Sequence, residues 1–387
     1  MHRKLIFSMN IYETLEKYEP QSMHRQLPVI WKKAKGSFVW DVNGKRYIDF
    51  TSGICVANAG HNNPRIVRAV RKANLYHTYS FPTAIRAEYL KELCDFTGFE
   101  KAFLLSAGTE ATETAVKLMR IASGKKVIIS IKGAMHGKTM LAEQLKGDFT
   151  WADKHCNVWH MPFPNDDDFI PPYAEDLAGF MIESYRGWDA GFYPKKYIQG
   201  LYKWAKENNI LVCFDEIQGG FGRTGKMFAY EHYGIERPDL VCIGKGMTSS
   251  LPMSGVLGSK AILDLPGDLS STHSGNPLCC AAGLANLQEI KRILPSVKEK
   301  EKILFDFFYK NFNEECINGH GLLAVLTMPE KLARSVCNKA MEKGLLLIKT
   351  DREAVKIAPP LVIPKDVLLK GLNILYRSIR EAEDEYN

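Results

Sequence analysis

Between residues 102 and 258 the chain alternates short apolar runs with stretches in which apolar residues recur at helical spacing. The runs are rich in β-branched residues, which is typical of strands buried on both faces of a parallel sheet. The predicted strands are Ala102–Leu105, Val127–Ile131, Val158–His160, Phe180–Ile182, Ile210–Phe214, Leu240–Ile243 and Gly255–Leu257. Helical spacing is clearest in Glu110–Ile121 and Tyr197–Glu207. The alternation predicts an α/β fold with a mainly parallel central sheet and helices on both of its faces.

The first fifty residues follow another pattern. A helical arm is predicted first, and apolar runs at Ser37–Trp40 and Arg46–Phe50 then flank a polar segment. That segment contains Asn43 and Gly44, a pair that is typical of β-hairpin turns. The two runs are therefore predicted to pair as antiparallel strands.

Beyond the helical run Pro277–Ile293 the chain returns to mixed elements. Strands are predicted at Leu322–Thr327 and Leu345–Ile348, and a final amphipathic helix at Pro364–Glu383. This tail has no obvious way to extend the central sheet, so we assign it to a second domain together with the N-terminal arm. The predicted domains are a large one, residues 51–290, and a smaller α+β domain built from residues 1–50 and 291–387.

Composition and charge exclude several classes of protein. A hydrophobic fraction of 45% and a charged fraction of 25% are ordinary for globular proteins, which argues against disordered and fibrous chains. The net charge of +7 is small for 387 residues, and the basic residues are scattered, so a nucleic-acid partner is not expected. No run approaches the roughly 18 apolar residues of a membrane span, and the apolar stretch after the basic start is too short for a signal peptide. A cytoplasmic location is predicted.

The nine cysteines are odd in number and show neither a C-x-x-C pair nor the spacing of metal ligands. They are predicted to be buried free thiols of a reducing compartment, and no metal site is expected. Cys279 and Cys280 are neighbours within an apolar helical run, where a place in the helix core is a better interpretation than a redox role.

Polar residues that directly follow predicted strands carry the most information, because ligands of open α/β sheets bind beyond the carboxyl ends of the strands. After the first strand, the small residues Ser106 to Thr109 lead into a helix. Backbone N–H groups at that helix start, with the Thr109 hydroxyl, would form an anion cradle suited to a phosphate. The alternative is that Ser106 or Thr109 is only a helix cap.

Two further strand ends carry a carboxylate and an amine. Asp215 follows a buried strand, where a charge is costly unless it faces a cation or several donors. Lys245 follows the next strand between two glycines, and a partly desolvated lysine there is a candidate nucleophile. Each residue alone is more often structural. Together they are expected to face one crevice, because neighbouring strand ends of such a sheet open into the same space.

Two loops add candidates for the same crevice. Thr272 lies in a polar turn before a helix and could supply another phosphate donor or simply form a loop and cap, whereas His136 could contact a cofactor or be structural. A phosphate cradle, a buried carboxylate and a buried lysine suit pyridoxal 5′-phosphate (PLP). The lysine would bond to the cofactor, the carboxylate would keep the pyridine nitrogen protonated, and the helix start would hold the phosphate.

These residues resemble motifs of the class III PLP-dependent aminotransferases, the group that contains the acetylornithine, ornithine and 4-aminobutyrate aminotransferases. The resemblance covers almost the whole chain and is most specific at Phe214–Gly225, which reads FDEIQGGFGRTG. Further matching segments are Thr51–Val56, Gly60-His61, Ser106–Ala111, His136–Thr139, Pro238-Asp239, Gly244–Gly246, Leu251-Pro252 and Gly275–Pro277. The resemblance implies the fold-type-I architecture of PLP-dependent transferases.

The resemblance also implies roles for individual residues. Lys245 would form the internal aldimine and act as general base, Asp215 would bind the pyridine nitrogen, and Gln218 would lie near the ring hydroxyl. Gly108 and Thr109 would hold the phosphate, with Thr272 reaching across from a partner subunit. The active unit would then be a homodimer with shared active sites.

Departures from the family pattern concern the cofactor ring and the substrate. Met135 stands before His136 where the family usually places a stacked aromatic ring, and Lys138 stands where acetylornithine enzymes carry arginine. Lys356 replaces an arginine that clamps the substrate carboxylate in many members, and lysine lacks the bidentate fork. The glutamate that gates this arginine is also missing, because the chain reads Ser-Tyr-Arg-Gly-Trp-Asp from 184 to 189. The residues expected on the substrate side are Ile54, Cys55, Lys138, Trp188 and Lys356.

The predicted function is transfer of an amino group from an amino-acid donor to an aldehyde, keto acid or keto sugar by a ping-pong mechanism. Class III folds also include racemases and aminomutases, so an amino-acid racemase, epimerase or aminomutase is the alternative. A cofactor-free binding protein of the same fold is a third hypothesis, against which Asp215 and Lys245 argue. The sequence leaves the identities of the donor and the acceptor open.

Overall fold

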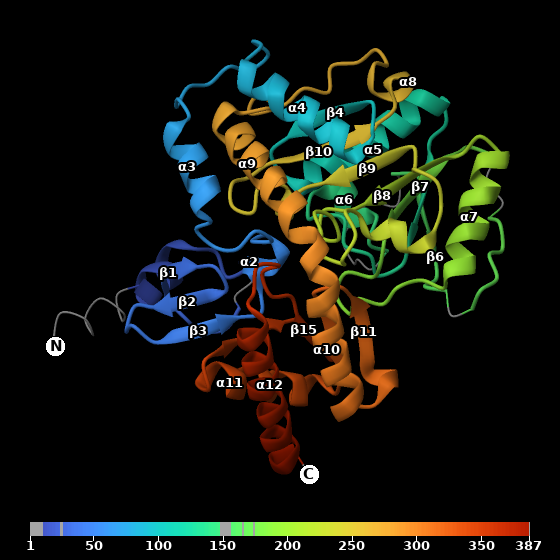
Figure 1. Ribbon diagram of the computed structural model, residues 1–387. Coiled ribbons are helices and arrows are strands. Elements are labelled where there is room, and N and C mark those ends of the chain that lie inside the picture. Colours follow the sequence, from blue (N-terminus) through green and yellow to red (C-terminus); the bar gives the residue numbers. More distant parts are fainter. Residues whose placement is uncertain (1–10, 24–25, 148–155, 165, 173–174, 387) are drawn as a thin grey trace.

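A seven-stranded sheet lies at the centre of the computed structural model (Figure 1). The structure describes residues 11–23, 26–147, 156–164, 166–172 and 175–386. The strands of the sheet are β4 (Lys101–Leu105), β5 (Val127–Ile131), β6 (Val158–Met161), β7 (Leu177–Glu183), β8 (Leu211–Asp215), β9 (Leu240–Ile243) and β10 (Ser254–Gly258). Their order is β4-β10-β9-β8-β7-β5-β6, and only β10 pairs antiparallel with its neighbours. The predicted α/β fold with a mainly parallel central sheet is confirmed.

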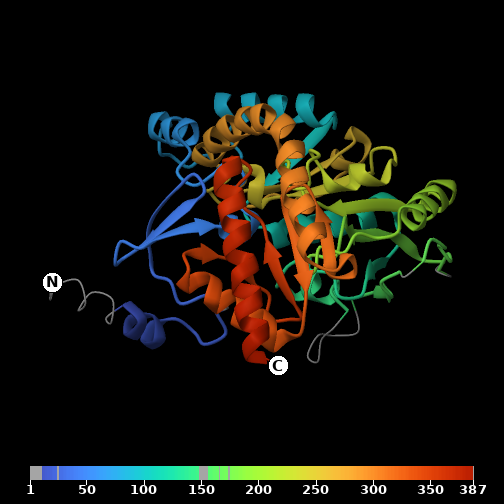
Figure 2. The ribbon, with the colours of Figure 1, turned by 60° about the horizontal axis from the view of Figure 1, so that its bottom comes forward.

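Helices cover both faces of this sheet (Figures 1 and 2). The main ones are α4 (Ala84–Thr97), α5 (Gly108–Ser123), α7 (Lys195–Glu207) and α9 (Pro277–Ile293). Successive residues of a strand point to opposite faces, so Cys213 packs in the cluster formed with α5, whereas Phe214 packs in the cluster formed with α4, α7 and α9. The two apolar layers hold the strand ends in fixed positions.

Two four-stranded sheets lie beside the central one. The first contains β1 (Trp31–Lys35), β2 (Phe38–Asp41), β3 (Arg46–Asp49) and β13 (Leu345–Leu346), in that order. The second contains β11 (Ile317–His320), β12 (Leu323–Thr327), β15 (Ala354–Ile357) and β14 (Ile348–Lys349), in that order. The predicted hairpin is confirmed, because β2 and β3 pair antiparallel across the Asn43-Gly44 turn. Strand β13 pairs with β3, so one sheet contains segments from both ends of the chain.

The sequence prediction was wrong for the apolar run Leu345–Ile348, which was expected to be one strand. The chain crosses between the sheets at Leu347: β13 pairs with β3, and β14 pairs with β15. A run of apolar residues indicates burial but not the strands with which the run pairs, so the sequence did not reveal the crossing. Strand β15 was missed, because Lys356 interrupts its apolar run.

The remaining helices complete the layers. They are α2 (Ser52–Cys55), α3 (Pro64–Lys72), α6 (Met140–Gln144), α8 (Lys260–Leu263), α10 (Val297–Asn311), α11 (Glu330–Glu342) and α12 (Lys365–Tyr386). Residues 11–18 are helical, as predicted for the N-terminal arm, whereas the start of that arm and the residues considered for a signal peptide, 1–10, lie outside the described residues. None of the described helices is long and apolar enough to cross a membrane.

All nine cysteines are free thiols, and six of them are buried. Cys279 and Cys280 both lie in the buried part of α9, which confirms their place in a helix core. Burial raises the pKa of Cys280 to about 12, so this thiol stays protonated.

Candidate active site

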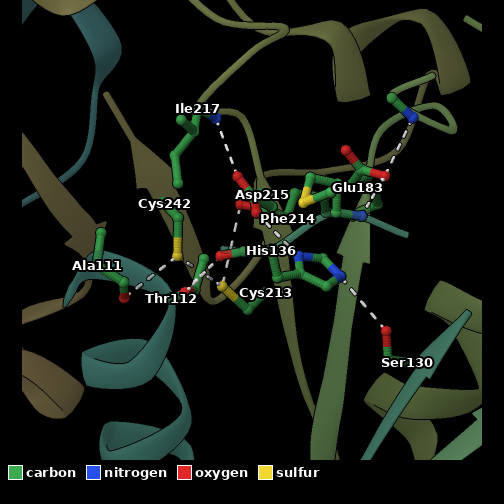
Figure 3. A network of polar contacts seen from close by, with 12 residues as sticks. Ala111, Thr112, Ser130, His136, Glu183, Cys213, Phe214, Asp215, Ile217 and Cys242 are labelled. Atoms are coloured by element: carbon green, nitrogen blue, oxygen red, sulfur yellow. Dashed lines mark hydrogen bonds and ion pairs between the residues drawn. The ribbon is translucent and has the colours of Figure 1, made fainter. Parts of the chain in front are cut away.

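The carboxyl ends of β7 and β8 bring two carboxylates side by side. The two strands are parallel neighbours, and Glu183 pairs with Asp215 at their ends. Both side chains lie in the network of polar contacts in Figure 3 and are almost completely buried, with 6% and 7% of their surface exposed. Two carboxylates this close and this buried need donors or cations to offset their desolvation.

A pocket of about 470 Å³ opens over these strand ends. It lies within the range of volumes that is typical of small-molecule sites. Its lining residues are Val56, Ser106, Gly108, Thr109, Met135, His136, Gly137, Glu183, Asp215, Ile217, Gln218, Lys245, Ser250, Leu251, Pro252 and Met253. The segments that follow β4, β5, β7, β8 and β9 thus meet in one place, as the sequence argument expected.

Asp215 is held by two donors. His136 Nδ1 lies 2.8 Å from Asp215 Oδ2, and the backbone N–H of Ile217 donates to Oδ1 at 3.1 Å. When Nδ1 donates to this carboxylate, the other ring nitrogen, Nε2, accepts from the Ser130 hydroxyl at 3.3 Å. Figure 3 shows this chain of contacts running from Ser130 through His136 to Asp215. His136 therefore fixes the orientation of the Asp215 carboxylate and offsets the free-energy cost of burying it.

The backbone around His136 is also fixed. The Thr112 hydroxyl donates to the carbonyl oxygen of His136 at 2.8 Å, which ties this loop to α5. The next residue, Gly137, has φ +142°, and a Cβ placed there would lie 2.5 Å from Thr109 Oγ1. Only glycine allows the loop to approach the start of α5 this closely.

Lys245 lies two residues after the end of β9, with Gly244 between them. Its backbone adopts φ +40°, a left-handed conformation that is strained for a lysine and is often found at functional sites. Gly244 before it is fully extended, with φ −178° and ψ −155°. Within the described ranges, the side-chain amine has no hydrogen-bond or ion-pair partner, although it lines a pocket that contains Asp215 and Glu183. An amine of this kind is available for covalent chemistry.

The first turn of α5 forms the opposite wall of the pocket. The Glu110 carboxylate accepts the backbone N–H groups of Ser106 at 2.8 Å and Ala107 at 2.9 Å, which satisfies the donors just before the helix. Gly108 and Thr109 begin the helix and line the pocket, and N–H groups of a first turn have no acceptor inside the helix. Their N–H groups, with the Thr109 hydroxyl, can bind an anion.

Comparisons with known proteins agree on one family. A family model described as Aminotransferase class-III matches residues 20–379. The chain belongs to the class III aminotransferases. An acetylornithine aminotransferase from Clostridium acetobutylicum is 33% identical over 378 residues, covering 91% of this chain and 96% of that protein. An ornithine aminotransferase from Saccharomyces cerevisiae is 31% identical, covering 98% of this chain and 99% of that protein.

A solved structure supports the same fold. The acetylornithine aminotransferase from Elizabethkingia anophelis aligns with a TM-score of 0.79 and 28% identity, covering 97% of this chain and 99% of that chain. This aminotransferase is therefore a PLP-dependent enzyme of the fold-type-I architecture, as the sequence motifs indicated. The racemase and aminomutase alternative gains no support from these relatives, which are all named as aminotransferases.

The pocket of this aminotransferase fits PLP. Lys245 offers an amine that none of the described residues binds, Asp215 offers a buried carboxylate fixed by His136, and the start of α5 offers donors for a phosphate. Met135 lines the pocket and is 44% exposed, so its thioether is free to contact a ring. The chemistry of this set of groups matches the aldehyde, the pyridine nitrogen and the phosphate of the cofactor.

The residues predicted for the substrate side divide into two groups. Ile54, Cys55 and Trp188 belong to one apolar cluster, and Lys356 is buried in the adjacent strand β15. Lys138, in contrast, is exposed, and none of the five substrate-side candidates is among the residues that line the pocket. Thr272 is exposed as well and lies outside the pocket of its own chain. Of these candidates, Lys356 reaches the pocket lining through its hydrogen bond to Gln218, so the substrate side stays a prediction.

Glu183 is a pocket residue that the sequence analysis did not single out. Its Oε2 atom accepts the backbone N–H groups of Met135 at 3.0 Å and Gly187 at 3.1 Å, so it joins the loops after β5 and β7. Burial raises its pKa to about 7, and the nearby Asp215 charge adds to that effect. Glu183 follows a buried strand directly, as Asp215 does, so the same pattern could have identified it.

Proposed function

We propose that this enzyme moves an amino group from an amino-acid donor to an aldehyde, keto acid or keto sugar by a ping-pong mechanism. The observation that carries the proposal is one pocket that contains the Lys245 amine, which has no partner in the described part of the chain, and the fixed buried carboxylate of Asp215. The relatives described above are named for acetylornithine and ornithine, so amino acids of this type are the donors to test first.

Lys245 is assigned two tasks. PLP, when bound, supplies an electron-withdrawing ring that stabilises negative charge on the substrate carbon that carries the amino group. Lys245 would hold the cofactor covalently and, as a free amine, would move a proton from and to that carbon. Its position two residues after the end of β9, on a left-handed backbone flanked by two glycines, supports this assignment.

The other pocket residues hold the cofactor in this proposal. Asp215, with His136 behind it, binds the ring nitrogen and keeps it protonated, while Gln218 lies near the ring hydroxyl and Met135 contacts the ring. Gly108 and Thr109 bind the phosphate from the start of α5. The fixed geometry of the His136–Asp215 contact, at 2.8 Å, supports the role of the carboxylate.

A homodimer that shares its active sites is part of the proposal. Thr272 is exposed, and its carbonyl oxygen lies 2.8 Å from His77 Nε2, next to a surface segment with an unusual number of apolar side chains. That segment, residues 75–81, exposes 87% of Leu75 and 74% of Phe81, together with Tyr76 and Tyr79. Exposed apolar side chains that cluster in this way are typical of protein interfaces. A second copy of the chain would cover them and receive Thr272 at its own phosphate site.

The substrate side is proposed to include Ile54, Cys55, Lys138, Trp188 and Lys356. Two guanidinium groups lie near the Trp188 ring, with Arg186 at 4.9 Å and Arg352 at 5.2 Å from the ring centre, and Arg186 is also paired with Asp189. We also propose a cytoplasmic location, which is supported by nine cysteines that are all free thiols.

The spectrum of bound PLP provides the test of this function. Incubation of the holoenzyme with a panel of amino acids, without an acceptor, should remove the visible absorption of the cofactor for true donors. Addition of a carbonyl acceptor should restore it, because the two half-reactions of a ping-pong mechanism are separable. A cofactor spectrum that persists during turnover while the donor loses its chirality would contradict transamination and favour a racemase.

A further inference from the structure

Lys356 is placed deep in the fold by its strand. It lies in β15 between β12 and β14, pairs with Val325 and Ile348, and has only 3% of its surface exposed. The flanking residues Val355 and Ile357 are completely buried. A central strand fixes the backbone, so the direction of this side chain is set by the sheet and not by solvent.

The amine of Lys356 has two neutral acceptors. It donates to the side-chain oxygen of Gln218, with Nζ and Oε1 2.6 Å apart, and to the carbonyl oxygen of Gly187. Within the described part of the chain, no carboxylate lies in ion-pair range of Nζ. Burial lowers the pKa of Lys356, but the uncharged amine still carries two N–H groups, enough for both acceptors.

These contacts determine which way the Gln218 carboxamide faces. An amine of lysine can only donate to an amide oxygen, and the Tyr185 hydroxyl donates to the same Oε1 atom at 3.4 Å. In the structure the amide oxygen faces Lys356 and accepts from both groups, which leaves the NH₂ group on the other side. Gln218 lines the pocket, and its nitrogen has no acceptor among the residues that the structure describes. The NH₂ group is thus a free donor at the pocket wall.

We propose that Lys356 is a positioning residue that orients the Gln218 carboxamide so that its NH₂ group donates into the cofactor pocket. The inference rests on the proposed function, in which Gln218 lies near the ring hydroxyl of PLP. A donor at that oxygen favours its ionised form and lowers the pH at which the absorption of the bound cofactor changes. Lys356 then affects the cofactor through Gln218.

A double-mutant cycle in the holoenzyme tests this chain of contacts. Lys356→Met should raise the midpoint of the absorption change of bound PLP by about one pH unit and weaken PLP binding about 10-fold, because Gln218 is no longer held. Gln218→Ala should have a similar effect. The double variant should match Gln218→Ala within about 2-fold, because Lys356 acts through Gln218.

Lys300 provides a matched control. It is also a buried lysine of the C-terminal region, 8% exposed, and its amine donates to Leu361 O at 2.5 Å and to Ser296 Oγ at 3.3 Å. Lys300→Met removes a comparable buried amine that has no contact with Gln218. It should lower the melting temperature as Lys356→Met does but leave the absorption midpoint and the PLP affinity unchanged.

Several results would overturn the inference. One is a Lys356→Met holoenzyme whose absorption midpoint and PLP affinity equal those of the wild type. Another is a midpoint shift on adding Lys356→Met to Gln218→Ala that is as large as in the wild type, which would mean that Lys356 contacts the cofactor directly. If Lys356→Met does not fold, Gln218→Glu keeps an oxygen for Lys356 but loses the NH₂ donor, so its midpoint should still rise. An unchanged midpoint there also overturns the inference. A wild-type protein that binds no PLP would refute the proposed function instead.

Discussion

At the scale of single residues, the chemistry depends on how each polar group is compensated after burial. Asp215 could be predicted from the sequence because a carboxylate that ends a buried strand needs partners. Its partner His136 lies 79 residues earlier, and Lys356 and Gln218 are 138 residues apart. Such pairs come together only when the sheets are assembled, so their hydrogen bonds could not be derived from a local pattern.

Glu183 should give the stability of the enzyme a specific dependence on pH. Its pKa is raised from 4.5 to about 7 by burial, so the folded protein holds this proton more tightly than the unfolded chain does. The contribution of this proton to the free energy of unfolding is therefore fully present below about pH 4.5 and is lost as the pH rises through about 7. In Glu183→Gln, which keeps an oxygen for the Met135 and Gly187 N–H groups, this loss should be smaller.

Melting temperatures measured from pH 4.5 to 7.5 at constant ionic strength test this prediction. Glu216→Gln is a useful companion variant, because burial also raises the pKa of Glu216 to about 7. Each single variant should reduce the fall of the melting temperature with rising pH, and the double variant should reduce it further. A slope in Glu183→Gln identical to that of the wild type would contradict the assignment.

At the scale of elements, the active site is formed by the ends of strands and the start of one helix. The apolar runs predicted β5, β9 and α9 with the observed bounds, because burial on the central sheet leaves a strong pattern. The crossing at Leu347 and strand β15 were not predicted, since pairing partners and a buried lysine leave no such pattern. The sequence therefore predicted the bounds of an element best where the pattern of its own apolar residues shows that it is buried.

The contact between the loop after β5 and the start of α5 gives a prediction at this scale. In Gly137→Ala the new Cβ would lie 2.5 Å from Thr109 Oγ1, on a backbone with φ +142°, so the loop must shift. We expect a loss of about 1–3 kcal/mol of stability and a clearly weaker affinity for PLP, because Thr109 belongs to the proposed phosphate site.

Gly124→Ala is the control for this variant. Gly124 also has a left-handed backbone, with φ +68°, at the end of α5, but a Cβ there meets nothing within 4 Å. Gly124→Ala should lower the stability by about 1 kcal/mol, because of the backbone conformation alone, and leave the affinity for PLP unchanged. Calorimetry and fluorescence titration with PLP measure the two effects, and equal PLP affinities in both variants would refute the role of the contact.

At the scale of the whole molecule, both ends of the chain are joined to the central region. Arg223, in the loop after β8, is completely buried, and its guanidinium donates to Leu322 O at 2.9 Å, Pro359 O at 2.6 Å and Asn58 Oδ1 at 2.6 Å. The division into residues 51–290 and a smaller domain from both ends stays a prediction, supported by the sheet in which β3 and β13 pair.

Sharing of active sites between two chains can be tested by complementation. Lys245→Ala and Thr272→Ala chains, each defective as a homodimer, are mixed to form heterodimers. If Thr272 serves the neighbouring chain, one site of each heterodimer has both Lys245 and Thr272 intact, so activity should return. If each Thr272 serves its own chain, no intact site forms, and the mixture stays as inactive as its components.

Reductive trapping of PLP tests the central claim most directly. The holoenzyme is treated with borohydride, digested and analysed by mass spectrometry, with Lys245→Ala as the control. The account predicts a pyridoxyl group on Lys245 in the wild-type protein and no labelled peptide in the variant. A label on a different lysine, or a wild-type protein without any label, would contradict the account.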